Sequence, residues 1–180
     1  MLMNAEDSAL LVIDVQERLL PHIDQGQRLL ENVQWLVKLA QEIGVPIMAS
    51  EQYPKGIGPT HADLARLLPA SAIVEKLHFS CVAADCLQPL AGYARKQLVV
   101  CGVESHVCVL QTVLDLRLQG KELFVVDDAV GSRRAQDKAL ALERMRTNGI
   151  TIVSREMVAF EWLRRAGTPL FKEISQRFLK

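Results

Sequence analysis

Short apolar runs alternate with longer helical patterns along the whole chain. Residues 9–13 are apolar throughout, as expected for a strand that is buried on both faces of a sheet. Residues 28–43 follow with apolar side chains at helical spacing, and Gly44 and Pro46 end that helix. The chain therefore begins with a strand and a helix, and we expect this unit to recur.

The same alternation predicts six strands with helices between them. Strands are expected at residues 9–13, 46–50, 72–76, 97–101, 122–126 and 150–153. Helices are expected at residues 28–43, 62–68, 84–94, 107–119, 136–148, 158–165 and 170–179. Residues 52–60 hold two Gly and two Pro and are expected to form a loop. The pattern predicts one domain over residues 1–180, a three-layer α/β/α fold with a six-stranded, mostly parallel, Rossmann-like doubly wound sheet.

Composition narrows the function classes. The 180 residues include 21 basic and 21 acidic side chains, so the chain lacks the basic excess typical of nucleic-acid binding. Its apolar runs are too short to span a bilayer, and its N-terminus lacks the basic region of a signal peptide. Four cysteines without an export signal indicate free thiols and a cytoplasmic location. Cys81, Cys86 and Cys101 are interpreted as structural.

Three chemically useful side chains follow predicted strands. Asp14 ends the first strand, Lys76 ends the third, and Cys108 opens the helix after the fourth. The carboxyl ends of parallel strands share one sheet edge, where ligands bind in such folds. A helix start favours a thiolate, and its free N–H groups can hold an oxyanion. Taken singly, Cys108 could instead be a buried structural thiol, Asp14 a loop cap and Lys76 a solvated edge residue.

The histidines add no clear chemistry. His106 is two residues from Cys108, and residues at that spacing on a helix do not face each other. His22, His61 and His78 have no spacing that indicates a catalytic or metal-binding role. Cys81 and Cys86 have C-x4-C spacing without a second Cys/His pair, so the sequence predicts no zinc site.

Three segments, residues 11–16, 75–80 and 102–109, resemble the isochorismatase-like cysteine hydrolases. The resemblance covers nearly the whole chain, with the segments in family order and at family spacing. It implies a three-layer α/β fold and a catalytic triad of Asp14, Lys76 and Cys108. It also implies an oxyanion hole made by the backbone N–H groups of Glu104 and Cys108, and a cis peptide bond between Val103 and Glu104.

Two departures from related families direct the functional prediction. Isochorismatases that cleave a vinyl ether commonly lack the nucleophilic cysteine, so Cys108 points toward amide-like substrates. Nicotinamidases carry an Asp-x-His metal motif after the second strand, whereas this chain keeps only Glu51 and His61 there. The resemblance thus implies a cysteine hydrolase of small amides that uses no metal or other cofactor. Its substrate pocket is expected to include Gln16, Glu51, Tyr53 and Phe79.

Other interpretations stay open. A catalytically idle scaffold of the same family, or a nicotinamidase-type amidase, would carry much of the same sequence. Nucleotide binding is disfavoured because no G-x-G-x-x-G follows the first strand. The resemblance implies a homo-oligomer of at least two chains. An apolar C-terminal stretch over residues 170–179 supports this, unless it packs on its own sheet.

Overall fold

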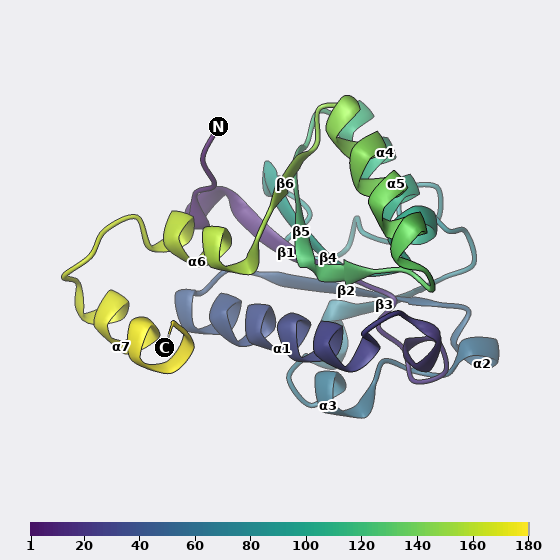
Figure 1. The fold of residues 1–180 in the computed structure, drawn as a ribbon, viewed down its shortest axis with the longest axis horizontal. Coiled ribbons are helices and arrows are strands. Elements are labelled where there is room, and N and C mark those ends of the chain that lie inside the picture. Colours follow the sequence, from purple (N-terminus) through teal and green to yellow (C-terminus); the bar gives the residue numbers. More distant parts are fainter. Residues whose placement is uncertain (180) are drawn as a thin grey trace.

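Six strands form one parallel sheet in the computed structural model, which describes residues 1–179. The strands are β1 Ser8–Ile13, β2 Ile47–Gln52, β3 Ile73–Lys76, β4 Gln97–Val103, β5 Glu122–Gly131 and β6 Thr151–Val153. Their order is β3-β2-β1-β4-β5-β6, and every neighbouring pair is parallel (Figure 1). The predicted doubly wound α/β class is confirmed. Strand order reverses beside β1, so the ends of β1 and β4 flank the switch point.

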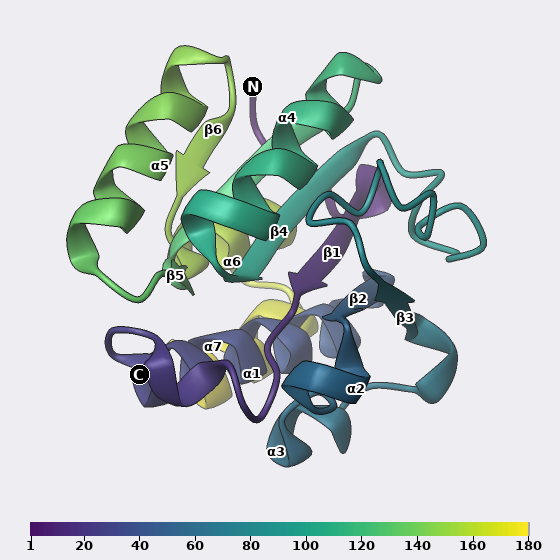
Figure 2. The ribbon, with the colours of Figure 1, turned by 90° about the vertical axis from the view of Figure 1, so that its right-hand side faces the viewer.

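Helices cover both faces of this sheet. They are α1 Gly26–Ile43, α2 Pro54–Ile57, α3 Ala62–Ala65, α4 Leu110–Leu118, α5 Ala135–Thr147, α6 Arg155–Leu163 and α7 Pro169–Phe178. Short 3₁₀ turns occur at Ala5–Asp7, Leu20–His22 and Ala70–Ala72, and a π-helical turn, η4, spans Ser105–Val109. Helices α4 and α5 lie on one face, and α1, α6 and α7 lie on the other (Figures 1 and 2).

Alternate residues of each central strand enter different hydrophobic cores. Leu10 and Val12 of β1 pack into the core beneath α1, whereas Leu11 and Ile13 pack into the core beneath α4 and α5. All four side chains are 0–1% exposed. Burial on both faces explains why the strand is apolar at every position.

The helix expected at residues 84–94 is wrong. Residues 77–96 form a series of turns between β3 and β4. Pro89 lacks the N–H that a helix interior needs, and Asp85 has a left-handed φ of 52°. Gly92 packs so closely on β1 that an added Cβ would lie 2.9 Å from the Ala9 Cβ. Tertiary packing on β1 therefore outweighs the helical spacing of the apolar residues in this segment.

Two smaller differences concern helix ends. The loop expected at residues 52–60 contains α2, a single turn that Pro54 begins. The helix expected from Val107 is already wound from Ser105, because η4 precedes α4 directly.

The C-terminal stretch packs on its own chain. Ile174 is fully buried, and Phe171, Phe178 and Leu179 pack against the core beneath α1. Trp35 of α1 meets Phe178 edge-on at a centroid distance of 5.6 Å. Packing within the chain therefore accounts for much of the apolar composition of this stretch, which gives no separate support for an oligomer surface. Among residues 1–179, no helix combines the length and the hydropathy needed to cross a membrane.

Candidate active site

Asp14 and Lys76, 62 residues apart in the sequence, form a buried ion pair at the carboxyl edge of the sheet. Lys76 Nζ donates to Asp14 Oδ2 over 2.8 Å, and both side chains are 0% exposed. Burial of an ion pair is costly unless each charge has further hydrogen-bond partners. Those partners identify the rest of the site.

Asp14 is held by β2. Its backbone N–H donates to the Ser50 carbonyl over 3.0 Å, and its Oδ1 accepts from Ser50 Oγ over 2.7 Å. Its φ is 53°, a left-handed value that directs the chain out of β1. Both carboxylate oxygens therefore have fixed partners: Ser50 for Oδ1 and Lys76 for Oδ2.

The side-chain amide of Gln52 lies between Lys76 and Cys108. The sequence pattern did not identify Gln52 as a site residue. Its Oε1 accepts from Lys76 Nζ over 2.6 Å and lies 3.9 Å from Cys108 Sγ. Its Nε2 donates to the Leu77 carbonyl over 2.8 Å, which fixes the orientation of the amide. Gln52 ends β2 beside Lys76 in the β2–β3 register. The strand-end rule did not select Gln52 because the second strand was expected to end at residue 50, whereas β2 continues to Gln52.

Cys108 lies in η4, directly after β4. The N–H groups of Val107 and Val109 both bond the Glu104 carbonyl over 3.1 Å, which winds this wide turn. Such turns occur often at functional sites. Cys108 is 5% exposed, so only a small group can reach its sulfur. The Val103–Glu104 peptide bond, one residue before η4, is cis.

Burial raises the pKa of the Cys108 thiol, and the nearby Asp14 carboxylate acts in the same direction, while Lys76 opposes both. The helix start was expected to favour a thiolate at Cys108, but burial outweighs that effect. Burial alone would lower the pKa of Lys76, but its attraction to the Asp14 carboxylate and its hydrogen bond with that group raise it overall. The resting site therefore pairs a protonated thiol with a charged Lys76.

The expected substrate-pocket residues have different positions. A cavity of about 450 Å³ beside Lys76 is lined by Tyr53, Pro54, Lys55, Glu75, Lys76, Leu77, His78 and Ala84. Tyr53 is therefore part of a cavity wall at this edge. Phe79 is 51% exposed on the same turn segment but is not part of this wall.

Gln16 and Glu51 hold the loop instead of lining that cavity. Gln16 Nε2 donates to the Gln52 and Gly58 carbonyls, and Gln16 Oε1 accepts from the Gln52 N–H over 2.8 Å. Glu51 Oε1 accepts from both the N–H and the hydroxyl of Thr60. Both residues therefore fix the backbone between β2 and α3.

The histidines do not form a metal centre. His106 Nδ1 lies 3.0 Å from Ser132 Oγ, and His61 Nδ1 accepts from the Asp63 N–H at the start of α3. Within residues 1–179, no three His, Cys, Asp or Glu side chains are grouped as a metal site requires. The residues at this sheet edge therefore do not fit a zinc or iron ion.

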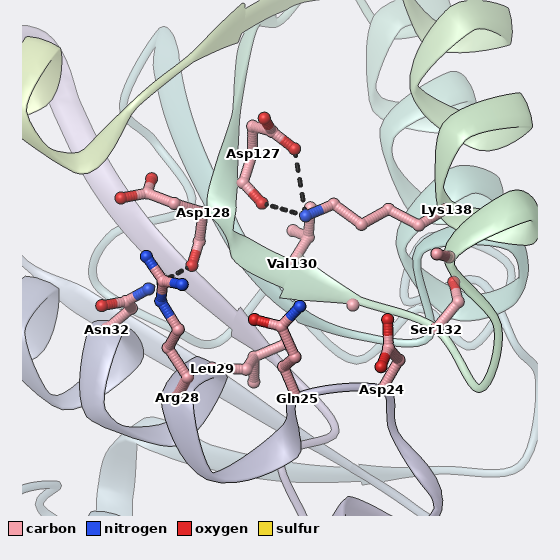
Figure 3. Close-up of a pocket in the computed structure, with 12 residues that line it drawn as sticks. Asp24, Gln25, Arg28, Leu29, Asn32, Asp127, Asp128, Val130, Ser132 and Lys138 are labelled. Carbon is pink, nitrogen blue, oxygen red and sulfur yellow. Dashed lines mark hydrogen bonds and ion pairs between the residues drawn. The ribbon is translucent and has the colours of Figure 1, made fainter.

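A second, polar cavity of about 280 Å³ lies between α1, β5 and α5 (Figure 3). Lys138 points across it and donates to the Asp127 carbonyl and carboxylate over 2.8 and 3.1 Å. Asn32 donates to the Asp128 carbonyl. Asp14, Lys76 and Cys108 are not among its lining residues, so this cavity is separate from the candidate catalytic site.

The chain is similar to known proteins over nearly its whole length. The Isochorismatase domain matches residues 8–157. The mouse protein named isochorismatase domain-containing protein 2A is 38% identical over 178 residues, covering 97% of this chain and 84% of that protein.

Solved structures agree with this match. A Caenorhabditis elegans structure described as MAR1 ribonuclease has a TM-score of 0.89 and 31% identity, covering 100% of this chain and 93% of that one. The Escherichia coli YcaC product, described as an octameric hydrolase of unknown specificity, has a TM-score of 0.86 and 25% identity over 92% of this chain and 83% of that one. A zinc-bound pyrazinamidase from Pyrococcus horikoshii has a TM-score of 0.65 and 26% identity over 82% of this chain and 99% of that one.

Proposed function

The chain belongs to the isochorismatase family of hydrolases, and we propose that it hydrolyses a C–N bond of a small amide through Asp14, Lys76 and Cys108. The observation that carries the proposal is the fully buried Lys76–Asp14 pair of 2.8 Å, next to a nearly buried thiol. Buried charges beside a thiol at a strand-end site are more typical of catalysis than of fold stability. The pyrazinamidase neighbour, itself an amidase by name, supports the choice of bond.

The first half of the reaction makes a thioester. Cys108 Sγ attacks the amide carbon as its proton passes to the Asp14 carboxylate, and the carbonyl oxygen becomes an oxyanion. The backbone N–H groups of Glu104 and Cys108 would stabilise that oxyanion. Asp14 then returns the proton to the nitrogen as the C–N bond breaks and the amine leaves.

The second half releases the acid. Water attacks the thioester while Asp14 accepts one of its protons, and the C–S bond breaks. The proton then returns to the Cys108 sulfur, which regenerates the resting site. Lys76 stays charged throughout and stabilises both the carboxylate and the developing thiolate. Because the pKa of Cys108 is raised, Asp14 has to remove the proton during attack.

The test is a screen of small amides and ureides against wild type and Cys108→Ala. Turnover should fall at least about a thousandfold in this variant because the nucleophile is lost. Cys86→Ala is the matched control, since it removes a partly exposed thiol that donates its hydrogen bond to the Cys81 carbonyl and not to the proposed triad. Activity that persists in Cys108→Ala would reject the thioester route. Wild-type turnover should also persist in the presence of a chelator. If the chelator abolishes turnover and added zinc or iron restores it, the metal-free reaction is rejected.

RNA cleavage is a second candidate because a structure described as a ribonuclease shares 31% of this sequence. The balance of 21 basic and 21 acidic residues and the 5% exposure of Cys108 favour a small uncharged substrate instead. The screen therefore includes an RNA oligonucleotide. Cleavage of RNA, without turnover of any amide, would replace the amidase proposal. If the protein turns over neither amides nor RNA, and if Cys108 resists alkylation, the protein would be the catalytically idle scaffold of the same family.

We further propose a homo-oligomer in solution. The octameric E. coli neighbour and the exposed Leu118, Leu77 and Leu140 support this assembly.

A further inference from the structure

The Glu104 carboxylate has a side-chain partner beside the neighbouring strand. Arg133 Nε donates to Glu104 Oε1 over 2.7 Å, and Arg133 Nη2 donates to Glu104 Oε2 over 3.1 Å. Such a two-bond fork fixes the plane of the carboxylate as well as balancing its charge. The Glu104 side chain is 7% exposed, whereas the Arg133 side chain is 63% exposed. The pair therefore joins a nearly buried carboxylate next to η4 to a guanidinium group at the surface.

The two backbone polar groups of Glu104 differ in their hydrogen bonds. Its carbonyl oxygen accepts from the N–H groups of Val107 and Val109. Its own N–H donates to no acceptor in the part of the chain that the structure describes. Nearly buried residues seldom leave a backbone donor unpaired. The carboxylate and the carbonyl of Glu104 are thus held, while its N–H is free to bind an oxygen of a substrate.

Arg133 reaches Glu104 from the end of β5. Val103 pairs with Gly131 in the β4–β5 register, so Glu104 and Arg133 follow neighbouring strand ends. Ser132, between Gly131 and Arg133, is 1% exposed. Only the Arg133 side chain of this short segment therefore extends along the surface, and it does so toward Glu104.

The segment that carries Arg133 is itself fixed in place. A Cβ at Gly131 would lie 2.6 Å from Leu29 Cδ1, so this backbone is pressed against α1. Ser132 Oγ lies 3.0 Å from His106 Nδ1, which is a second contact between this segment and η4. Two consecutive side chains after β5 thus hold the turn that contains the candidate nucleophile.

We propose that Arg133 is a positioning residue for the oxyanion of the reaction. Its fork holds the Glu104 side chain, and this keeps the Glu104 peptide in place so that its N–H stays available to the carbonyl oxygen of the substrate. The inference rests on the thioester route of the proposed function. Because the guanidinium group is mostly in water, the ion pair adds little stability. Loss of Arg133 should therefore slow the reaction without unfolding the protein.

Two reagents separate oxyanion stabilisation from the reactivity of the thiol itself. When Cys108 attacks p-nitrophenyl acetate, the carbonyl oxygen becomes an oxyanion, the C–S bond forms, and the ester C–O bond breaks to release p-nitrophenolate, which is measured by absorbance. When Cys108 attacks iodoacetamide, iodide leaves a saturated carbon and no oxyanion forms. Alkylation is read from the mass of tryptic peptide 97–117, and fragmentation of that peptide distinguishes Cys108 from the fully buried Cys101.

Arg133→Gln should slow acylation by the ester about tenfold, after subtraction of the Cys108→Ala rate, and should leave alkylation within about twofold of wild type. Arg133→Lys keeps the charge but loses the fork, so its acylation rate should lie between those of Arg133→Gln and wild type. Arg134→Gln is the matched control, because the Arg134 side chain makes no capping hydrogen bond at the start of α5. Equal slowing of both reactions in Arg133→Gln, or no slowing of acylation, would overturn the proposal.

A second comparison tests whether Arg133 acts through Glu104. In a Glu104→Gln background, which already lacks the carboxylate, Arg133→Gln should slow acylation by less than about twofold. A further slowing of about tenfold would show that Arg133 acts independently of Glu104 and would overturn the proposal. A wild-type Cys108 that is alkylated but never acylated would reject the proposed thioester route, and the inference with it. Acylation of wild type with equal slowing of both reactions in Arg133→Gln would reject only the role of Arg133.

Discussion

At the scale of single residues, the site depends on two opposite charges that are buried together. Lys76 and Asp14 are each 0% exposed in their side chains, so neither charge can be hydrated if the other is removed. This differs from the pair of Lys96 and Glu122, whose lysine side chain is 67% exposed. Loss of one buried partner should therefore affect folding far more than loss of a surface partner.

Lys76→Met should destabilise the protein by about 3–5 kcal/mol, because it leaves the Asp14 carboxylate buried and unpaired. The double variant Asp14→Asn, Lys76→Met should recover most of that loss while staying inactive. Urea denaturation monitored by circular dichroism measures both. Lys96→Met is the control and should leave the midpoint unchanged. A double variant as unstable as Lys76→Met would contradict the buried-pair argument.

The same pair predicts a pH dependence. The folded-state pKa of Lys76 is raised above the ordinary value of 10.5, so its stabilisation is fully present below pH 10.5. It is lost as the pH rises through the raised value. The stability difference between wild type and Lys76→Met should stay constant from neutral pH to about pH 10 and shrink beyond it. If this stability difference instead begins to shrink below neutral pH, a group other than Lys76 controls the pH dependence.

Gln52→Leu should lower turnover about tenfold, because Lys76 loses its 2.6 Å acceptor and moves relative to Cys108. The fall should appear in kcat more than in KM. Alkylation of Cys108 followed against pH should also shift, which a purely structural role would not produce. Gln27→Leu, on the exposed side of α1, is the control. Unchanged kcat and an unchanged alkylation profile would remove Gln52 from the site.

At the scale of elements, the close approach of β4 to β1 places Cys108 beside Asp14. Gly102 makes this approach possible, since its φ is 115° and a Cβ there would lie 2.0 Å from the Ile13 carbonyl oxygen. Ile13 directly precedes Asp14, so displacement of the backbone at Gly102 would displace both strand ends of the candidate site. Only glycine fits this position.

Gly102→Ala should prevent stable folding or cost more than about 4 kcal/mol. Gly120→Ala is a matched control, because Gly120 also has a positive φ, 83°, but nothing lies within 4 Å of an added Cβ. The control should cost only about 1–2 kcal/mol of backbone strain. Thermal unfolding of the two variants gives the comparison. Similar midpoints would mean that β1 and β4 can separate without cost.

At the scale of the whole molecule, the described surface keeps large apolar side chains in water. Leu118 is 87% exposed, Leu77 72% and Leu140 58%. Light scattering at micromolar concentration should give a mass that is a multiple of 20.1 kDa. Leu118→Glu should reduce that mass if α4 contributes to the interface. A wild-type mass of 20.1 kDa would reject the oligomer proposal.

The amino-acid sequence alone determined the alternation of strands and helices and the sheet edge at which Asp14, Lys76 and Cys108 meet. Strands buried on both faces need continuous apolar runs, and parallel strands place their carboxyl ends at one sheet edge, so both features follow from a pattern that is visible in the sequence. Interactions between distant segments decided the rest. Close packing of Gly92 on β1, with Pro89 and the left-handed Asp85, excluded the helix at residues 84–94.

Tertiary structure also decided the chemistry of the site. Burial raises the pKa of the Cys108 thiol despite the nearby Lys76. Gln52 becomes part of the site because β2 and β3 pair in a register that puts it beside Lys76. A pKa and a hydrogen bond both depend on which groups surround an atom after folding. Sequence pattern therefore located the side chains of the proposed triad, and only the packed structure determined their burial and their hydrogen-bond partners.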